Sequence, residues 1–233
     1  MENIIEEIDE LIKEKLQLGL IDFIDAGCGT GGSIDYCKKR FGTNVGIGFD
    51  LDEVKIDKAQ NDGYLVFLQD ILKFDFPEKS VMFSSMMDFL EHLPNYNSAK
   101  QIIQTLGNAS RDFLFIRHPN FDDIDYLRQM GLKLTWTDWT GHTNMMTVAD
   151  YCKLFQELGW DDYRIIPQKR IKNSLEEVII PLDGPTNINK FSQLEGFEKP
   201  EVEFDKPIFY QYDIYIKLNK NIDNDHWNLI TNF

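Results

Sequence analysis

The sequence has little cysteine and no long apolar run, and these scarcities exclude several classes of protein. Its 233 residues include three cysteines, at Cys28, Cys37 and Cys152. Three dispersed cysteines form neither a disulfide framework nor the paired spacing of a zinc site. No apolar stretch approaches the roughly 18 residues needed to cross a bilayer. The N-terminal segment lacks the basic start and apolar centre of a signal peptide. We therefore expect reduced cysteines, no membrane span and a cytoplasmic location.

Basic residues are also scarce. Lys and Arg total 24 against 39 Asp and Glu, which gives a formal net charge of −15. Long nucleic acids are bound mainly through Lys and Arg contacts to phosphates, and no run of five or more basic residues is present. Nucleic acid is therefore disfavoured as a partner, and a small molecule is favoured as the substrate.

Helical and extended segments alternate along the first half of the chain. Residues 1–18 place apolar side chains at helical spacing and predict an amphipathic opening helix. Short buried strands are expected at 21–24, 44–50, 64–68, 80–86 and 111–118, with helices at 33–40, 51–61 and 97–107. Strands separated by helices of about ten residues indicate βαβ units and a parallel sheet. The length suits a single domain over residues 1–233.

Two segments of the second half interrupt this alternation. Residues 119–146 show no clear period, so we expect a loop-rich insertion after the fifth strand. Its Tyr126, Trp136 and Trp139 form either an aromatic wall for a substrate or the core of the insertion itself. Residues 167–207 are acidic and contain several prolines. We expect them to form a second insertion, acting as a cap or as the surface of a homodimer.

Regular structure returns around these insertions. Thr147 can cap a helix over 147–158, because Asp150 stands three residues later and Gly159 follows the end. Strands are expected at 163–166 and 208–218. The second of these alternates strongly and comes late in the chain. Such a strand is typical of an antiparallel edge strand that closes a sheet.

A glycine-rich loop lies between the first strand and the first following helix. It reads Asp25-Ala26-Gly27-Cys28-Gly29-Thr30-Gly31-Gly32. Glycines at such a place let the chain turn sharply and let backbone amides approach a ligand. The small side chain of Cys28 suits the same loop. The spacing also satisfies G-x-G-x-x-G, and a lone match of that kind does not separate a dinucleotide from another nucleotide.

Three acidic residues at successive strand ends distinguish a dinucleotide from another nucleotide as the ligand. Asp25 would repel a pyrophosphate and attract an ammonium group, and Asp50 can accept hydrogen bonds from ribose hydroxyls. Asp70 can accept from an adenine amino group, with Ile71 packed on the ring. Each acid alone would be a helix cap or a solvated turn residue. Together they favour a cationic ligand that carries a ribose and an adenine.

The segment from Ile21 to Pro94 resembles class I methyltransferases that depend on S-adenosylmethionine (SAM). The resemblance covers IDAGCGTGG, VGIGFDLD, FLQDI and MMDFLEHLPN, in the family's order and spacing. It implies a Rossmann-like, doubly wound, seven-stranded α/β sheet with the last strand antiparallel. It also implies SAM as the cofactor, contacted by Asp25, Gly27, Cys28, Gly29, Asp50, Leu51, Asp70, Ile71 and Met86.

The segment Asp88-Phe89-Leu90-Glu91-His92 follows the fourth strand, where this family forms its acceptor site. If it is helical, Asp88, Glu91 and His92 share one face and can hold a divalent cation. His142 adds to this pattern, because it precedes a helix after the fifth strand. The pattern resembles ubiquinone-biosynthesis O-methyltransferases and small-RNA 2′-O-methyltransferases, in which D/E-x-x-E-H binds a metal.

The resemblance implies that Asp88, Glu91, His92 and His142 bind Mg or Mn. Asp88 departs from the usual Glu by its shorter reach. The alternative is that His92 packs against the cofactor pocket and His142 hydrogen-bonds a loop. His118 follows the fifth strand and is either a general base or a packing partner at the strand end. His92, His118 and His142 are thus the candidate catalytic residues.

These observations predict methylation of a hydroxyl group on a small molecule. A hydroxylated metabolite, or a saccharide- or nucleotide-linked intermediate such as those of surface-polysaccharide biosynthesis, fits best. The alternatives are a metal-dependent RNA 2′-O-methyltransferase, a SAM-binding module without catalysis, and an oxidoreductase that binds NAD. The charge of −15 disfavours RNA.

Overall fold

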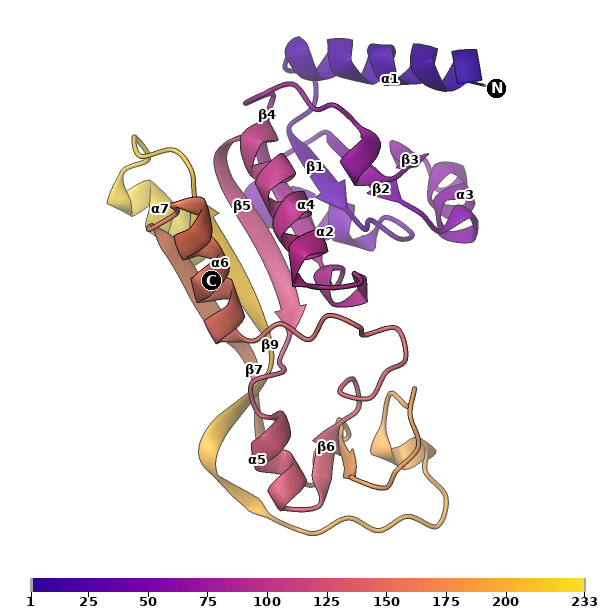
Figure 1. Ribbon diagram of the computed structural model, residues 1–233, viewed down its shortest axis with the longest axis vertical. Coiled ribbons are helices and arrows are strands. Elements are labelled where there is room, and N and C mark those ends of the chain that lie inside the picture. The colour runs from indigo at the N-terminus through magenta and orange to yellow at the C-terminus, as the bar shows by residue number, and fades with distance from the viewer. Residues whose placement is uncertain (1, 233) are drawn as a thin grey trace.

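A seven-stranded sheet forms the centre of the computed structural model, which describes residues 2–232 (Figure 1). Its strand order is β3-β2-β1-β4-β5-β9-β7. The strands are β1 (Phe23–Ala26), β2 (Gly46–Asp50), β3 (Val66–Leu68), β4 (Val81–Met87), β5 (Ser110–Pro119), β7 (Tyr163–Asn173) and β9 (Glu203–Lys217). Neighbours from β3 to β5 are parallel, and β9 runs antiparallel to both β5 and β7. The predicted Rossmann-like sheet with an antiparallel last strand is confirmed.

Helices cover both faces of this sheet, because successive strand residues point to opposite sides. Ile24 belongs to a buried cluster that includes residues of α1 (Glu2–Gln17), α4 (Tyr96–Ala109) and α6 (Val148–Leu158). Phe23, its neighbour in β1, belongs to a second cluster, with residues of α2 (Gly32–Phe41), α3 (Glu53–Asn61) and α7 (Asn224–Thr231). The sheet is therefore the middle of three layers. None of the helices within residues 2–232 is long and apolar enough to cross a membrane.

The predicted boundaries of the helix after the first insertion are confirmed. The Thr147 side chain accepts from the Asp150 amide, and Asp150 in turn accepts from the Thr147 amide. This capping box satisfies amides that have no partner within the helix. Gly159 ends α6 in the left-handed conformation, with φ 70°. A glycine adopts that conformation without steric cost.

The second half holds more regular structure than predicted. The expected strand at 163–166 is the start of the eleven-residue β7, which pairs with β9 over nearly its whole length. The first insertion contains α5 (Ile124–Gln129) and β6 (Leu132–Leu134), and the second contains β8 (Ile179–Pro181). β6 and β8 pair antiparallel. These elements are too short to show a period, so tertiary pairing decides their structure.

Residues 119–146 and 174–202 pack together, and we call them the cap. A buried cluster joins them to the far ends of β7 and β9. Its members are Phe121, Leu127, Leu132, Leu134, Trp136, Ile171, Val178, Ile179 and Ile208. Figure 1 shows the cap beyond the end of β5, where β7 and β9 run on past the rest of the sheet. The homodimer expected of the second insertion stays a prediction, as does the single domain.

The chain leaves β1 toward β2 and leaves the neighbouring β4 toward β5, so the strand order reverses between β1 and β4. In open α/β sheets, ligands bind at the carboxyl ends of the strands where the order reverses in this way. The loops after β1, β2, β3 and β4 meet at this edge, and the cap stands next to it.

Candidate functional site

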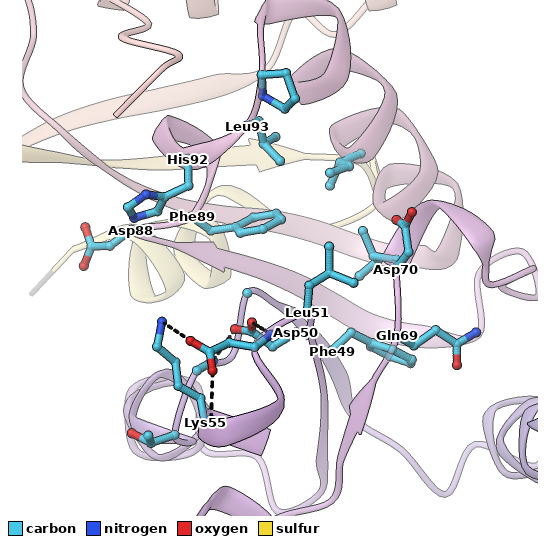
Figure 2. Close-up of a pocket in the computed structure, with 17 residues that line it drawn as sticks. Phe49, Asp50, Leu51, Lys55, Gln69, Asp70, Asp88, Phe89, His92 and Leu93 are labelled. Atoms are coloured by element: carbon cyan, nitrogen blue, oxygen red, sulfur yellow. Dashed lines mark hydrogen bonds and ion pairs between the residues drawn. The ribbon is translucent and has the colours of Figure 1, made fainter. Parts of the chain in front are cut away.

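A first cavity of about 850 Å³ opens at the carboxyl ends of β1 and β4. The glycine loop, the end of β2, the turn after β3 and the segment after β4 form its walls (Figure 2). Of the residues that the sequence predicts as cofactor contacts, Gly27, Gly29, Asp50, Leu51, Asp70 and Ile71 line it. Residues from four separate loops are thus brought to one cavity. This volume suits a nucleotide-sized ligand.

Gly27 is the first residue of the chain beyond β1, and it has φ 70°. A Cβ atom built on it would lie 2.3 Å from a ring carbon of Phe89. The Phe89 ring, which follows β4, projects into the cavity (Figure 2). Only a glycine tolerates both the positive φ and the ring at this distance. The glycine loop and the segment after β4 are therefore in direct contact.

Asp50 ends β2 and organises the mouth of the cavity. Its Oδ2 accepts from the Gly29 amide at 2.8 Å, and its Oδ1 accepts from the Asp52 amide at 2.9 Å. The carboxylate therefore ties the glycine loop to the start of α3 and still lines the cavity. Each oxygen keeps further acceptor capacity for a ligand hydroxyl.

Asp70 and Ile71 form the wall after β3. Asp70 Oδ1 accepts from the Leu72 amide at 3.0 Å and caps a short 3-10 helix, η1 (Ile71–Lys73). Ile71 is buried and presents an apolar side chain to the cavity. A polar acceptor beside an apolar surface suits the amino edge and the face of an adenine ring.

Three predicted cofactor residues lie behind the cavity wall. Asp25, Cys28 and Met86 are buried in the layers on either side of the sheet and do not line the cavity. Asp25 accepts from the Ser85 hydroxyl at 2.6 Å and from the Ser33 hydroxyl. Burial raises the pKa of Asp25 to about 6, against these hydrogen bonds that lower it. We had expected Asp25 to face a ligand; it instead supports the glycine loop from beneath.

A second cavity of about 520 Å³ adjoins the first and extends to the cap. Lys55, Asp88 and His92 line both cavities. Glu91 and His142 line the second, whose remaining wall is Pro119, Thr135, Trp136, Trp139, Asn189, Tyr210 and Gln211. The three shared residues mark the junction at which ligands in the two cavities would meet.

Aromatic side chains dominate the cap wall of the second cavity. The Trp136 ring packs against Tyr210 at 4.8 Å between centroids, and its Nε1 donates to Asn120 O at 2.9 Å. Trp136 thus serves both the cap core and the cavity, while Trp139 is half-buried and lines the cavity. Tyr126 does not line it, since its hydroxyl bonds Asp205. The two predicted roles of the aromatic residues are therefore divided among them.

The segment after β4 is not one continuous helix, so the prediction that Asp88, Glu91 and His92 share one helical face is wrong. β4 ends at Met87, Asp88 takes a left-handed φ of 49°, and a 3-10 helix, η2, covers Leu90–His92. The Asp88 amide still bonds Arg117 O at 3.0 Å, which continues the pairing of β4 with β5, and the chain turns at the left-handed Asp88. Asp88 therefore leaves the face of Glu91 and His92. Burial, and next the charge of Glu91, raises the pKa of Asp88 to about 6.

Glu91, His92 and His142 each offer a ligand atom, and these atoms lie within 4.8 Å of one another. Asp88 is outside this group, which corrects the predicted set of four. His92 Nδ1 lies 3.0 Å from Gly141 O, and His142 Nδ1 lies 2.8 Å from Trp136 O. Because a carbonyl oxygen only accepts, both rings carry their proton on Nδ1 and keep the Nε2 lone pair. Burial lowers the pKa of His142, which favours the neutral ring.

His118 is not placed as a general base. Its side chain is 1% exposed and lines neither cavity. Its Nδ1 lies 3.5 Å from Glu91 Oε2, beneath the group of possible ligands. The prediction that His118 lines the acceptor cleft is therefore wrong, because its ring is buried against Phe121 and Tyr151.

Some lining residues carried no signal in the sequence. Lys55 stands in the first turn of α3 and resembles any exposed helix residue. Tyr210 belongs to an alternating strand that also predicts a core position, and Asn189 lies in an irregular stretch. Phe89 belongs to the MMDFLEHLPN motif, which gives it no role of its own. The contact with Gly27 depends on a fold that brings two loops together, which spacing alone does not reveal.

Comparisons with known proteins agree with a nucleotide-binding site at this edge of the sheet. Residues 2–165 match a family model described as a methyltransferase domain. No curated protein matches the sequence. A SAM-dependent methyltransferase from Archaeoglobus fulgidus is similar in fold, with a TM-score of 0.60, 16% identity, and 90% of this chain and 94% of that chain covered.

Two further solved structures share the fold. One is a SAM-dependent methyltransferase from Methanosarcina mazei, with a TM-score of 0.51, 14% identity, and 84% and 91% of the two chains covered. The other, from Thermotoga maritima, is a SAM-dependent methyltransferase and possible histamine N-methyltransferase. Its TM-score is 0.52 with 10% identity, and 89% of each chain is covered.

Proposed function

This chain belongs to the methyltransferase domain family and is a class I SAM-dependent methyltransferase, and from that premise we propose that it methylates a hydroxyl group of a small, saccharide-like acceptor. The observation that carries the proposal is the pair of adjoining cavities with Lys55, Asp88 and His92 at their junction. The first cavity holds the cofactor and the second holds the acceptor. Methyl transfer then takes place at the junction.

The first cavity is matched to SAM by its polar residues. Asp50 accepts from the ribose hydroxyls, and Asp70 accepts from the adenine amino group while Ile71 packs on the ring. The Gly27 and Gly29 backbone approaches the methionine part of the ligand. Asp25 acts indirectly, because Ser33 and Ser85 occupy its oxygens behind the wall.

The second cavity is matched to a hydroxylated ring compound. Trp139 and Tyr210 offer aromatic faces, and Thr135, Asn189 and Gln211 offer hydrogen-bonding groups. Aromatic surfaces with a few directed polar groups are typical of sites that bind sugars and other ring compounds. RNA is disfavoured, because Lys55 is the one Lys or Arg residue among those that line the two cavities.

The reaction is an in-line displacement. An acceptor oxygen at the junction forms a bond to the methyl carbon while the bond from that carbon to the sulfonium sulfur breaks. The oxygen must lie about 3 Å from the methyl group and lose its proton. Asp88 lines both cavities and lies outside the group of possible metal ligands, so we assign it as the residue that receives this proton.

We include Mg or Mn in the proposal, because the donor set fits a divalent cation. Glu91 Oε2 is buried without a hydrogen-bond partner in the part of the chain that the structure describes, and both histidines present Nε2 with Nδ1 bonded to a carbonyl. Histidine ligands of metals almost always donate their other ring N–H in this way. Glu91, His92 and His142 would hold the ion. When bound, it would lower the pKa of the acceptor hydroxyl and fix its position.

Calorimetry with S-adenosylhomocysteine (SAH) and NAD tests the cofactor. We expect SAH to bind and NAD to bind weakly or not at all. Transfer of labelled methyl groups from SAM to sugars, other small alcohols, amines and short RNAs then tests the acceptor class. Tighter binding of NAD would overturn the cofactor assignment. Transfer to RNA or amines alone would overturn the hydroxylated small molecule, and SAH binding with no transfer to any class would favour a binding module.

The cation is tested on protein stripped with a chelator. Titration with Mn²⁺ should show a site whose affinity falls at least about 10-fold in His142→Ala. His226→Ala is the matched control, since His226 is exposed in α7, away from the other histidines. Full turnover after stripping, with no loss in His142→Ala, would refute the cation.

A further inference from the structure

A set of buried polar atoms without hydrogen-bond partners lies beneath the Glu91, His92 and His142 group. Among residues 2–232, Glu91 Oε2, both ring nitrogens of His118 and the Tyr151 hydroxyl are buried and have no hydrogen-bond partner. Each of these three side chains is 1% exposed. A buried polar group without a partner costs about 1–3 kcal/mol. Such a concentration of unpaired atoms beside one site indicates a hydrogen bond that forms when a cation is bound there.

The geometry singles out His118 and Glu91 as the two partners. His118 Nδ1 lies 3.5 Å from Glu91 Oε2, slightly beyond hydrogen-bond distance. The His118 ring is held edge to face by Phe121 at 5.4 Å and by Tyr151 at 5.3 Å between centroids. Its two aromatic neighbours restrict its orientation. A small shift of the Glu91 carboxylate is then sufficient to close the hydrogen bond.

We propose that His118 is a positioning residue whose Nδ1–H donates to Glu91 Oε2 and orients that carboxylate toward the divalent cation. The inference rests on the cation site of the proposed function. Carboxylates that ligate metals are themselves hydrogen-bonded, and removal of such an outer partner typically lowers metal affinity 10- to 100-fold. His118 does not line either cavity, so it acts through Glu91 and touches neither cofactor nor acceptor.

The proposal specifies a tautomer. A carboxylate only accepts hydrogen bonds, so the neutral His118 ring must carry its proton on Nδ1. Nε2 then has the lone pair. The same tautomer is required of His92 and His142 by their bonds to Gly141 O and Trp136 O. Three histidines of one site would therefore share the Nδ1–H form.

The test measures Mn²⁺ affinity on the full chain after chelator treatment, by the electron paramagnetic resonance signal of free Mn²⁺. His118→Leu removes the donor and keeps an apolar side chain in the buried site. His118→Asn places an amide N–H near the position of Nδ1. We expect Mn²⁺ affinity to fall about 10- to 100-fold in His118→Leu and to stay close to that of the unsubstituted protein in His118→Asn. SAH affinity should be the same in all three proteins.

Equal Mn²⁺ affinity in His118→Leu and the unsubstituted protein would overturn the positioning role alone. No Mn²⁺ binding by the unsubstituted protein would overturn the cation site, and the role of His118 with it. If His118→Leu loses SAH binding, its fold is damaged and the tautomer decides the question. ¹⁵N NMR of the unsubstituted protein with Mg²⁺ should show the Nδ1–H form of His118, and the Nε2–H form would overturn the proposal.

Discussion

His92 and His142 pack edge to face, with their ring centroids 4.9 Å apart, and each points Nδ1 at a backbone carbonyl oxygen. The carbonyl that accepts from His92 belongs to Gly141, the residue before His142. The loop that carries one histidine therefore orients the other. Any change that moves this loop should alter both rings together.

Asn144 fastens this loop to η2, and we expect Asn144→Ala to loosen it. The Asn144 side-chain amide donates to Leu90 O at 3.0 Å, and its backbone amide donates to Glu91 O at 3.0 Å. Loss of the side chain removes one of two hydrogen bonds to Leu90 O, which still accepts from the Leu93 amide at 3.3 Å, at a cost of about 0.5–1.5 kcal/mol. Urea unfolding should report this loss of stability, and Mn²⁺ affinity should fall with it. Met145→Ala, at an exposed position of the same loop, should change neither.

Gly27→Ala should destabilise the protein, whereas Gly32→Ala in the same loop should not. The new Cβ on Gly27 would lie 2.3 Å from the Phe89 ring, and nothing lies within 4 Å of a Cβ on Gly32. Overpacking of this kind costs about 1–3 kcal/mol. Thermal unfolding measures both variants. Phe89→Ala added to Gly27→Ala should recover part of the loss, and no recovery would mean that backbone strain at φ 70° dominates.

Asp50→Ala should weaken SAH binding by at least about 10-fold, since a charge-assisted hydrogen bond contributes about 1.5–3 kcal/mol. The substitution removes the acceptor of the Gly29 and Asp52 amides as well as the proposed ribose contact. Calorimetry of SAH is the measurement, with the exposed Asp57→Ala on α3 as the matched control. Similar SAH affinity in the two variants would contradict the role of Asp50.

Asp25→Asn should remove a pH dependence of stability. Burial raises the pKa of Asp25 from 3.8 to about 6, so the folded state holds this proton more tightly than the unfolded state. Ionisation between about pH 4 and pH 7 therefore lowers the free energy of unfolding, and the full contribution corresponds to about 3 kcal/mol. Asn does not ionise, and it keeps an oxygen that accepts from a serine hydroxyl.

Urea unfolding at pH 4 and pH 7.5 measures this effect. The free energy of unfolding of Asp25→Asn, relative to that of the unsubstituted protein, should rise by about 2 kcal/mol between the two pH values, because the unfolded state is already partly ionised at pH 4. Asp57→Asn, at an exposed position, should show no such rise. A constant difference at both pH values would mean that Asp25 keeps its ordinary pKa in the folded protein.

The sheet and the first cavity could be predicted because their signals are local. Buried runs such as Phe23–Ala26, followed by turn residues, indicate strands, and the acids at the end of β2 and after β3 reach the same edge because the strands are parallel. Asp25 fails the same rule because it stands inside its strand, where the side chain points into a buried layer. Position at a strand end, and not charge, separates these acids.

The acceptor side was harder to predict because it depends on contacts between distant segments. The spacing of Asp88, Glu91 and His92 predicts one helical face. The Asp88 amide instead still pairs with Arg117 O of β5, and its left-handed φ separates it from the 3-10 helix that carries the other two. His118 is placed by the rings of Phe121 and Tyr151, which no spacing in the sequence connects to it. His142 was found because a resemblance supplied the long-range partner that periodicity lacks.

The separate core of the cap bears on how this protein could acquire a new acceptor. Within residues 2–232, the buried cluster of the cap shares no member with the two clusters that flank the sheet. Replacement of the cap by that of another protein would therefore leave the two clusters that flank the sheet intact. Because β6 pairs with β8, residues 119–146 and 174–202 would have to be exchanged together. Either segment moved alone would leave a strand without its partner, so an exchange of the proposed acceptor wall has to include both.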